Sequence, residues 1–204
     1  MTRTGKSMKI ETLVCGALEE NAYIVTGPEE GVCAVIDPGD DEAALLRAVE
    51  GRKVDKILLT HGHYDHILGA GALMEKTGAP LYVGAGDMAM LGDEKLCLYD
   101  PGVSRARFSP LTATAYGDTV EAAGIVFRVC PTPGHTPGGV CLYAENEKVI
   151  FTGDTLFMGG YGRTDFPGGS FAQIRSSLRF LLSLPGETAF YPGHGQCGAI
   201  GANR

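Results

Sequence analysis

One short segment, residues 60–66, holds most of the side chains that could bind a metal ion. It reads Thr-His-Gly-His-Tyr-Asp-His, an H-x-H-x-D-H pattern that follows an apolar, strand-like run. Its first two histidines are two positions apart, so in an extended chain they point to the same side. Imidazoles and a carboxylate this close would be unfavourable if merely buried. A divalent cation removes that problem, and nitrogen with oxygen ligands suits zinc, manganese or iron.

Three further candidate ligands stand in glycine-containing loops, each next to a predicted strand. They are His135 in PTPGHTPGG, Asp154 in TGDT and His194 in PGHG. Strand ends gather residues that are distant in the sequence into one cleft, and glycine lets the backbone approach a metal closely. With the H-x-H-x-D-H segment, these loops account for all five histidines of the chain. The sequence therefore predicts a metal site.

The number of candidate ligands favours two metal ions over one, because a catalytic zinc takes only three protein ligands and a water. We expect the following division: His61, His63 and His135 on the first ion, Asp65, His66 and His194 on the second, and Asp154 as the bridge. Zinc is the expected metal, with iron and manganese as alternatives.

Two such cations, roughly 3.5–4 Å apart, share a water and lower its pKa toward about 7, which creates a hydroxide nucleophile. One of them also polarises a carbonyl and stabilises the developing oxyanion. The candidate catalytic carboxylates are Asp65 and Asp154. This chemistry predicts hydrolysis of an acyl bond without a serine or cysteine nucleophile.

The composition argues against nucleic acid and membranes as binding partners. The 204 residues suit one domain, and 24 acidic against 17 basic residues give a net charge of −7. A general binder of nucleic acid or anionic membranes would lean the other way, and no apolar run approaches the ~18 residues of a membrane helix. Residues 1–7 are polar, without a visible secretion signal. We expect an N-terminal tail over 1–7, native or left from cloning, a folded domain over 8–204, and a cytoplasmic protein.

The elements that must position the candidate ligands alternate between strands and helices. Strands are expected over residues 8–15, 21–26, 32–36, 54–60, 81–83, 125–130, 140–143, 148–152 and 189–191. Helices are expected over 41–50, 69–76, 86–91 and 171–182, and residues 93–118 read as an irregular, lid-like segment. Four of the six cysteines fall in strand-like runs and are expected to be buried rather than paired. The pattern favours a layered α/β domain.

The motifs T-H-x-H-x-D-H, P-G-H-T-P-G, T-G-D-T and P-G-H-G, in this order, resemble the metallo-β-lactamase-fold superfamily. The resemblance covers residues 35–195 and implies an αβ/βα four-layer sandwich with the metals at one edge. The segment VIDPG fits the first motif of that superfamily. Asp37 is therefore expected to orient ligands rather than to bind a metal itself.

Within the superfamily, the segment 156–170 (LFMGGYGRTDFPGGS) is similar to short glyoxalase-II-like, or hydroxyacylglutathione hydrolase-like, enzymes. True class B β-lactamases usually differ inside the H-x-H-x-D motif or use a cysteine near the position of Asp154. Here both places carry the hydrolase-type residue, His66 and Asp154. Full glyoxalase II adds a C-terminal helical domain that supplies much of the glutathione site. This chain stops ten residues after His194, so that domain is expected to be absent.

The resemblance implies a hydrolase of thioesters or related small acyl esters, with a small-molecule substrate and no nucleic-acid or membrane partner. One alternative is a persulfide dioxygenase, which shares the fold and the G-R-T-D-F segment and binds a single iron. Here its ligands would be His61, His135 and Asp154. A lactonase is the other alternative, and the oligomeric state is left open.

Two residues of the segment 156–170 are candidates for substrate binding. Arg163 could hold a substrate carboxylate with two hydrogen bonds, or could pair with Asp165 and brace its own loop. Tyr161 could donate a hydrogen bond to an oxyanion, or could simply pack at the rim. The sequence leaves both pairs of alternatives open.

Overall fold

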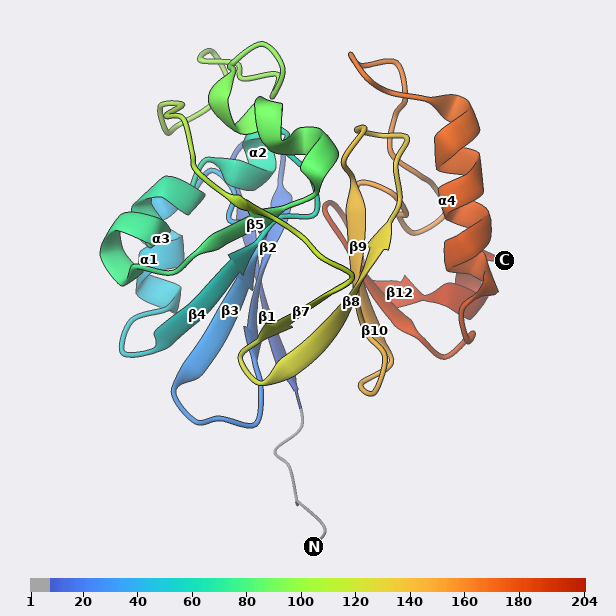
Figure 1. The fold of residues 1–204 in the computed structure, drawn as a ribbon, viewed down its shortest axis with the longest axis horizontal. Helices are drawn as coiled ribbons and strands as arrows, with labels where there is room; N and C mark the ends of the chain where they lie inside the picture. The colour runs from blue at the N-terminus through green and yellow to red at the C-terminus, as the bar shows by residue number, and fades with distance from the viewer. Residues whose placement is uncertain (1–7) are drawn as a thin grey trace, which may run out of the picture.

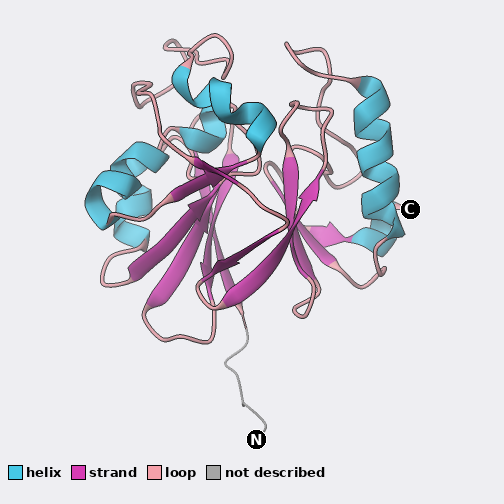
Figure 2. Cartoon of the chain, in the orientation of Figure 1, coloured by secondary structure: helices cyan, strands magenta, loops and turns pink. Residues whose placement is uncertain are grey.

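Two six-stranded β-sheets lie face to face, and helices cover the outer side of each sheet (Figures 1 and 2). This arrangement comes from a computed structural model that describes residues 8–204; the predicted tail of residues 1–7 lies outside the described residues. The layering confirms the αβ/βα sandwich that the resemblance implies. Within residues 8–204, no helix is long and apolar enough to cross a bilayer.

The first sheet is built from the N-terminal half of the chain in sequence order. Its strands are β1 (Lys9–Cys15), β2 (Glu20–Thr26), β3 (Val32–Ile36), β4 (Lys53–Leu58), β5 (Leu81–Val83) and β6 (Thr114–Ala115). Strands β1 to β3 pair antiparallel, whereas β3 to β6 pair parallel. Strand β3 is buried along its whole length, because both faces of the sheet are covered. Its continuous apolar sequence, VCAVI, follows from that burial.

The second sheet is built from the C-terminal half. Its strands are β7 (Thr119–Ala122), β8 (Ile125–Pro131), β9 (Val140–Ala144), β10 (Val149–Gly153), β11 (Ala189–Pro192) and β12 (Gly198–Ala199). All neighbours pair antiparallel except β10 and β11, which are parallel because a helix connects them. The carboxyl ends of β10 and β11 therefore open at the same edge of the sheet.

Helices pack on the outer faces. They are α1 (Glu42–Ala48), α2 (Tyr64–Ile67), α3 (Ala70–Thr77), α4 (Phe171–Ser183) and the 3₁₀-helices η1 (Ala85–Gly92) and η2 (Ile200–Asn203). At the start of α4, Ser170 Oγ accepts a hydrogen bond from the Gln173 backbone N–H at 3.4 Å, as its capping sequence predicts. Helix α3 ends at Gly78, whose φ of +71° suits a residue without a Cβ.

The core that holds the two sheets together is rich in aromatic side chains. The rings of Tyr23 and Phe127 lie 5.1 and 6.2 Å from the ring of Phe151, and all three residues are buried. Two further apolar clusters fill the space under α1 and α3 and under α4. All six cysteines are free and five are buried, as expected. These three clusters fix the sheet edge on which the candidate ligands stand.

Sequence reasoning located the longer elements and missed short ones. The missed elements are β6, β7, β12, α2 and η2, and the helix expected over 86–91 is the 3₁₀-helix η1. A strand of two residues, such as β6 or β12, is too short for an alternating pattern to stand out. It forms because a neighbouring strand offers it a partner. The irregular segment expected over 93–118 contains only β6, near its end.

Candidate metal centre

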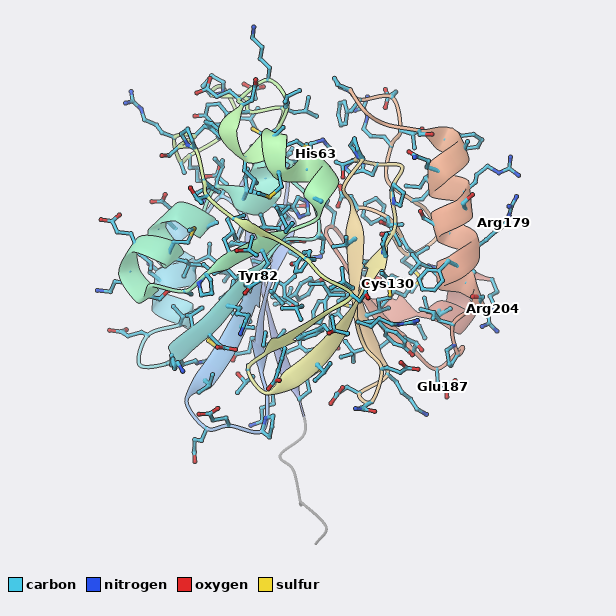
Figure 3. The ribbon with its side chains drawn as sticks, viewed as in Figure 1. His63, Tyr82, Cys130, Arg179, Glu187 and Arg204 are labelled. Carbon is cyan, nitrogen blue, oxygen red and sulfur yellow. The ribbon has the colours of Figure 1, made fainter. Side chains whose placement is uncertain are left out.

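The H-x-H-x-D-H segment supplies four of the seven candidate ligands and lies where the chain passes from strand β4 of the first sheet into helix α2. His61 and His63 follow the carboxyl end of β4. The chain then enters α2, which carries Asp65 and His66 on its only turn. In Figure 3, His63 lies where the two halves of the molecule meet.

The second sheet supplies the other three ligands from three separate places. His135 lies in the loop between β8 and β9, Asp154 directly follows β10, and His194 follows β11. Their side chains meet the H-x-H-x-D-H segment across the junction of the two sheets. The structure thus brings all seven predicted ligands together.

Four groups of three candidate ligand atoms, each within 4.8 Å of one another, occur among residues 8–204, and two of them are His61, His66, Asp154 and Glu20, Asp37, His66. The other two hold six of the seven predicted ligands and are His61, His63, His135 and Asp65, His66, His194. This is the division that the sequence predicts. The Nδ1 atom of His63 lies 2.9 Å from Nε2 of His135, so the two nitrogens face the same small space.

Asp154 faces both groups. Its Oδ2 lies 3.4 Å from His135 Nε2 in the first group and 3.7 Å from His194 Nε2 in the second. Its Oδ1 lies 3.5 Å from His66 Nε2. This placement suits a bridging carboxylate; the ligand role of each of the seven residues stays a prediction.

In four of the five histidines, Nδ1 contacts an oxygen atom of a neighbouring residue. The contacts are His61 with Thr60 Oγ1 at 3.1 Å, His66 with Asp37 Oδ2 at 3.2 Å, His135 with the Arg163 carbonyl at 2.8 Å and His194 with the Leu18 carbonyl at 3.0 Å. A carbonyl or carboxylate oxygen can only accept, so Nδ1 carries the proton there. The Nε2 lone pair is then free for a cation.

Several of the inward-facing atoms have no partner of their own. The Nε2 atoms of His61 and His66 and the Oδ1 atom of Asp154 are buried without a hydrogen bond. A buried polar group left in this state costs about 1–3 kcal/mol. A Cβ at Gly193 would overlap Asp154 Oδ1, so a side chain there would intrude on the site. A divalent cation would satisfy the orphaned donor atoms, and the nitrogen and oxygen donor set fits it.

Without cations, the electrostatics favour the metal-binding protonation state at His61, His63 and Asp154. Burial, aided by neighbouring imidazoles, holds the pKa of His61 well below its ordinary value, and burial and His135 lower the pKa of His63 to about 3. Burial alone would raise the pKa of Asp154, but the adjacent His66 outweighs it and lowers that pKa. At His66 and His194, burial would lower the pKa, but nearby carboxylates, Asp65 first, outweigh it and raise the pKa. Neutral imidazoles and ionised carboxylates are the forms that bind metal ions.

Asp37 makes the contacts that the resemblance implies. Its Oδ1 accepts a hydrogen bond from the Thr60 backbone N–H at 2.7 Å. Its Oδ2 accepts from Thr60 Oγ1 at 2.6 Å and faces His66 Nδ1 at 3.2 Å. Asp37 therefore contacts His66 directly and His61 through Thr60. It also forms a potential ligand group with Glu20 and His66, so its supporting role stays a prediction.

Sequence reasoning missed Asp87, a fully buried carboxylate on η1. It accepts hydrogen bonds from the Gly62 N–H at 3.0 Å, from Thr136 Oγ1 at 2.7 Å and from the Gly138 N–H at 2.6 Å. It therefore ties the loop of His61 and His63 to the loop of His135. The signal was present, because a lone aspartate inside an apolar, glycine-containing run needs buried partners.

Sequence reasoning also missed Glu20 and Asn21, which lie next to the loop of His194. Asn21 Nδ2 donates to the carbonyls of Pro192 at 3.1 Å and Gly195 at 3.0 Å. Glu20 is fully buried 3.6 Å from His66 Nδ1, and burial raises its pKa well above the ordinary value. The sequence shows two polar residues at the start of β2, and it gives no sign of their contacts with distant segments.

A cleft of about 530 Å³ opens above the ligands. Arg163 lines it, and its Nε and Nη2 donate to the two carboxylate oxygens of Asp165 at 2.7 and 2.6 Å. Tyr161 is outside the lining, 47% exposed, with its ring 6.5 Å from that of Phe171. The Arg163 pair is the bracing geometry that the sequence left open, and a substrate role for either residue stays a prediction.

Comparisons with known proteins agree with this geometry. The sequence model of the Metallo-beta-lactamase superfamily matches residues 15–194. Hydroxyacylglutathione hydrolase GloC of Haemophilus influenzae is 32% identical, over 97% of this chain and 95% of that protein. Members of this superfamily are typically metal-dependent hydrolases.

Two solved structures share almost the whole fold. BLEG-1 B3 metallo-beta-lactamase matches with a TM-score of 0.84 and 31% identity, over 95% of each chain. TTHA1623 in a di-iron-bound form matches with a TM-score of 0.84 and 35% identity, over 94% of this chain and 96% of that one.

Proposed function

This chain belongs to the metallo-β-lactamase superfamily, and from that premise we propose that it is a dinuclear metallohydrolase of thioesters or related small acyl esters. The observation that carries the proposal is the double ligand group, three residues on each side of the Asp154 carboxylate. The similarity to a hydroxyacylglutathione hydrolase supports the thioester class. The proposed partner is a small molecule, and the cytoplasmic location stays a prediction.

Two divalent cations, held by the two ligand groups, would supply a hydroxide at neutral pH and polarise the substrate carbonyl. The residues of the chain do the rest. Asp154 directs Oδ2 toward both groups and Oδ1 toward His66 of the second group, so its carboxylate stands between the two groups. Asp65 lines the cleft and its Oδ2 lies 3.2 Å from His194 Nε2, so a proton released by water can be held there.

The first test is metal content per chain, by elemental analysis of protein expressed with zinc and iron both supplied. We expect about two equivalents, zinc or mixed, as a dinuclear site requires. The same preparation is then assayed against thioesters, lactones and a β-lactam; the β-lactam is included because one structural neighbour is a B3 metallo-beta-lactamase. Thioester turnover that disappears after chelation and returns with metal would support the proposal. About one equivalent of metal would overturn the dinuclear assignment.

A mononuclear iron persulfide dioxygenase is the second candidate, because its expected ligands also converge. His135 Nε2 lies 3.4 Å from Asp154 Oδ2, and His61 belongs to a potential ligand group with each of them. The complete second group of Asp65, His66 and His194 favours the hydrolase instead. About one equivalent of iron, with oxygen uptake on addition of a persulfide, would reverse this preference.

A further inference from the structure

We propose that the cleft selects substrates with an apolar acyl group and a leaving group without negative charge. The inference rests on the proposed hydrolase function and names its substrate class. It predicts that thioesters of neutral thiols are better substrates than the corresponding glutathione thioesters. Three features of the cleft lead to this proposal: its walls, its charges and one strained residue.

The walls of the cleft are apolar and adjoin both ligand groups. Leu18, Leu98, Phe157 and Phe166 line it, and they come from three segments of the chain, because both phenylalanines lie in the segment 156–170. The Phe166 ring lies 5.7 Å from that of His63, and the Phe157 ring lies 6.3 Å from that of His194. Leu18 remains 47% exposed. Apolar side chains around a polar floor are typical of a site that buries the apolar part of a small ligand.

The charges of the lining oppose an anionic leaving group. Apart from histidines, Arg163 is the one cationic side chain among the described residues that line the cleft, and Asp100 is the one lining carboxylate outside the predicted metal ligands. The guanidinium of Arg163 pairs with Asp165 and lies 4.0 Å from the Phe166 ring centroid. Its charge is therefore already balanced. Cations on the floor act on the reacting carbonyl, whereas a remote carboxylate would meet the rim and exposed Asp100.

Leu98 is held in a strained conformation on the wall. Its φ is +63°, a region that branched side chains rarely occupy. The backbone is fixed on both sides, because Leu98 N–H donates to the Lys95 carbonyl at 3.3 Å and Tyr99 N–H to the Glu94 carbonyl at 2.8 Å. Strained residues of this kind cluster at binding sites. The strain here places an apolar side chain in the cleft.

The test compares matched substrates on the zinc-loaded protein. S-hexanoyl-N-acetylcysteamine and S-hexanoylglutathione share the acyl group and differ in the thiol, which is small and neutral in the first and an anionic tripeptide in the second. S-acetyl-N-acetylcysteamine shortens the acyl group. Each buried methylene is worth up to about fourfold. In an open cleft we expect kcat/KM to rise roughly tenfold from acetyl to hexanoyl. We expect the neutral hexanoyl thioester to exceed the glutathione thioester about threefold or more. A preference for the glutathione thioester, or no effect of acyl length, would overturn the inference.

A binding measurement separates this inference from the proposed function. The unreactive thioethers S-hexyl-N-acetylcysteamine and S-hexylglutathione are titrated into the protein by calorimetry. We expect the neutral thioether to bind more tightly. Equal or tighter binding of S-hexylglutathione would contradict the inference, even if no thioester is hydrolysed. Absence of any thioester turnover, with the expected order of binding, would instead contradict the proposed function.

Two variants locate the selectivity. Asp165→Asn releases Arg163, so kcat/KM for S-hexanoylglutathione should rise about threefold, with a smaller change for the neutral thioester. Glu187→Gln breaks a comparable exposed pair with Lys148 (3.0 Å) and should leave the ratio of kcat/KM for the two hexanoyl thioesters unchanged.

Leu98→Asn introduces a polar residue that tolerates positive φ and should reduce the effect of acyl length. Val126→Asn changes a 55% exposed apolar residue outside the cleft and is its control. Unchanged ratios in both Asp165→Asn and Leu98→Asn would argue against the assignment.

Discussion

The two halves of the candidate metal centre are built in different ways. In the first sheet, one run of six residues supplies His61, His63, Asp65 and His66. The local chain positions them, because His66 N–H donates to the His63 carbonyl at 3.1 Å as the strand turns into α2. In the second sheet, three loops supply one ligand each. These ligands are positioned by segments that are remote in the sequence, such as the Leu18 carbonyl behind His194.

The ligands of the first half are positioned by neighbouring residues in the sequence, whereas those of the second half are positioned by tertiary packing. The first half needs little more than β4 and the turn that follows it. The second half acquires its geometry only when the two sheets pack, because its loops are joined to the first sheet by Asp87 and Asn21. Asp154 is the ligand that faces both halves. Substitutions at these joints should therefore affect metal binding in a graded way, depending on which half they disturb.

The largest effect is expected for Asp154→Ala, which removes the carboxylate shared by both halves. Both ions should be lost on chelator treatment that leaves the unmodified protein loaded, and turnover should fall below detection. The physical reason is that each group of three loses its fourth protein donor, and the carboxylate shared by the two proposed ions is gone. Metal content and thioester hydrolysis are measured on the same preparation. Retention of activity would exclude Asp154 as the bridge.

The matched control is Asp118→Ala, which also deletes one carboxylate but at an exposed position outside both ligand groups. Metal content and activity should stay as in the unmodified protein. A comparable loss in both variants would indicate that net charge, rather than the bridging position of Asp154, governs metal uptake.

A smaller effect is expected for Asp87→Asn, which weakens the tie between the loops of the first ion. An amide cannot accept all three hydrogen bonds that the carboxylate accepts, so at least one buried donor loses its partner. We expect a loss of about 1–3 kcal/mol in the free energy of unfolding. Affinity for the first ion should fall roughly 10–100-fold, as for other residues that support ligands. Chelator competition measures that affinity without relying on turnover.

Asp55→Asn is the control for this variant. Asp55 also accepts a backbone hydrogen bond across the two sheets, from Ala123 N–H at 2.9 Å, but it contacts no ligand loop. It should lower stability without changing metal affinity. Equal affinities for Asp87→Asn and the unmodified protein would show that Gly62 and Gly138 stay in place without the carboxylate.

The same difference between the halves explains what the sequence could predict. The H-x-H-x-D-H segment is readable because covalent spacing alone places its side chains together. His135, Asp154 and His194 were found because glycine-containing loops at strand ends mark them, and the resemblance covers them as an ordered set. The long strands and α4 were found in the same way, from continuous apolar runs and a capping sequence.

What the sequence could not predict is set by packing between distant segments. Asn21 is one polar residue at the start of a strand, and its contacts with Pro192 and Gly195 span more than 170 residues of chain. The wall residue Leu98 lies in the irregular segment 93–118, where no periodic pattern exists. Its position depends on a positive φ, and a leucine in the sequence gives no reason to expect one. The substrate-binding surface was therefore less predictable than the metal centre.

The smallest effect is expected for Asn21→Ala, which disturbs one loop of the second half alone. The variant removes the amide donor from the Gly195 carbonyl and one of two side-chain donors from the Pro192 carbonyl, which keeps the Tyr23 hydroxyl, so the loop of His194 loosens. Affinity for the second ion should fall by about tenfold or less, because the support acts through the backbone and not on the imidazole itself. Affinity for the first ion should not change.

A stepwise chelator titration resolves the two ions in this experiment. Asn203→Ala is the control, because Asn203 also holds two backbone groups, the Phe157 carbonyl at 2.8 Å and the Gly159 N–H at 3.0 Å, in the loop after Asp154, and its side chain contacts no ligand of the second ion. It should leave both affinities unchanged. If Asn21→Ala weakened both ions equally, the two halves would be coupled more tightly than their separate supports imply. The site would then respond as one unit, because the shared Asp154 carboxylate would transmit a displacement of His194 to His135.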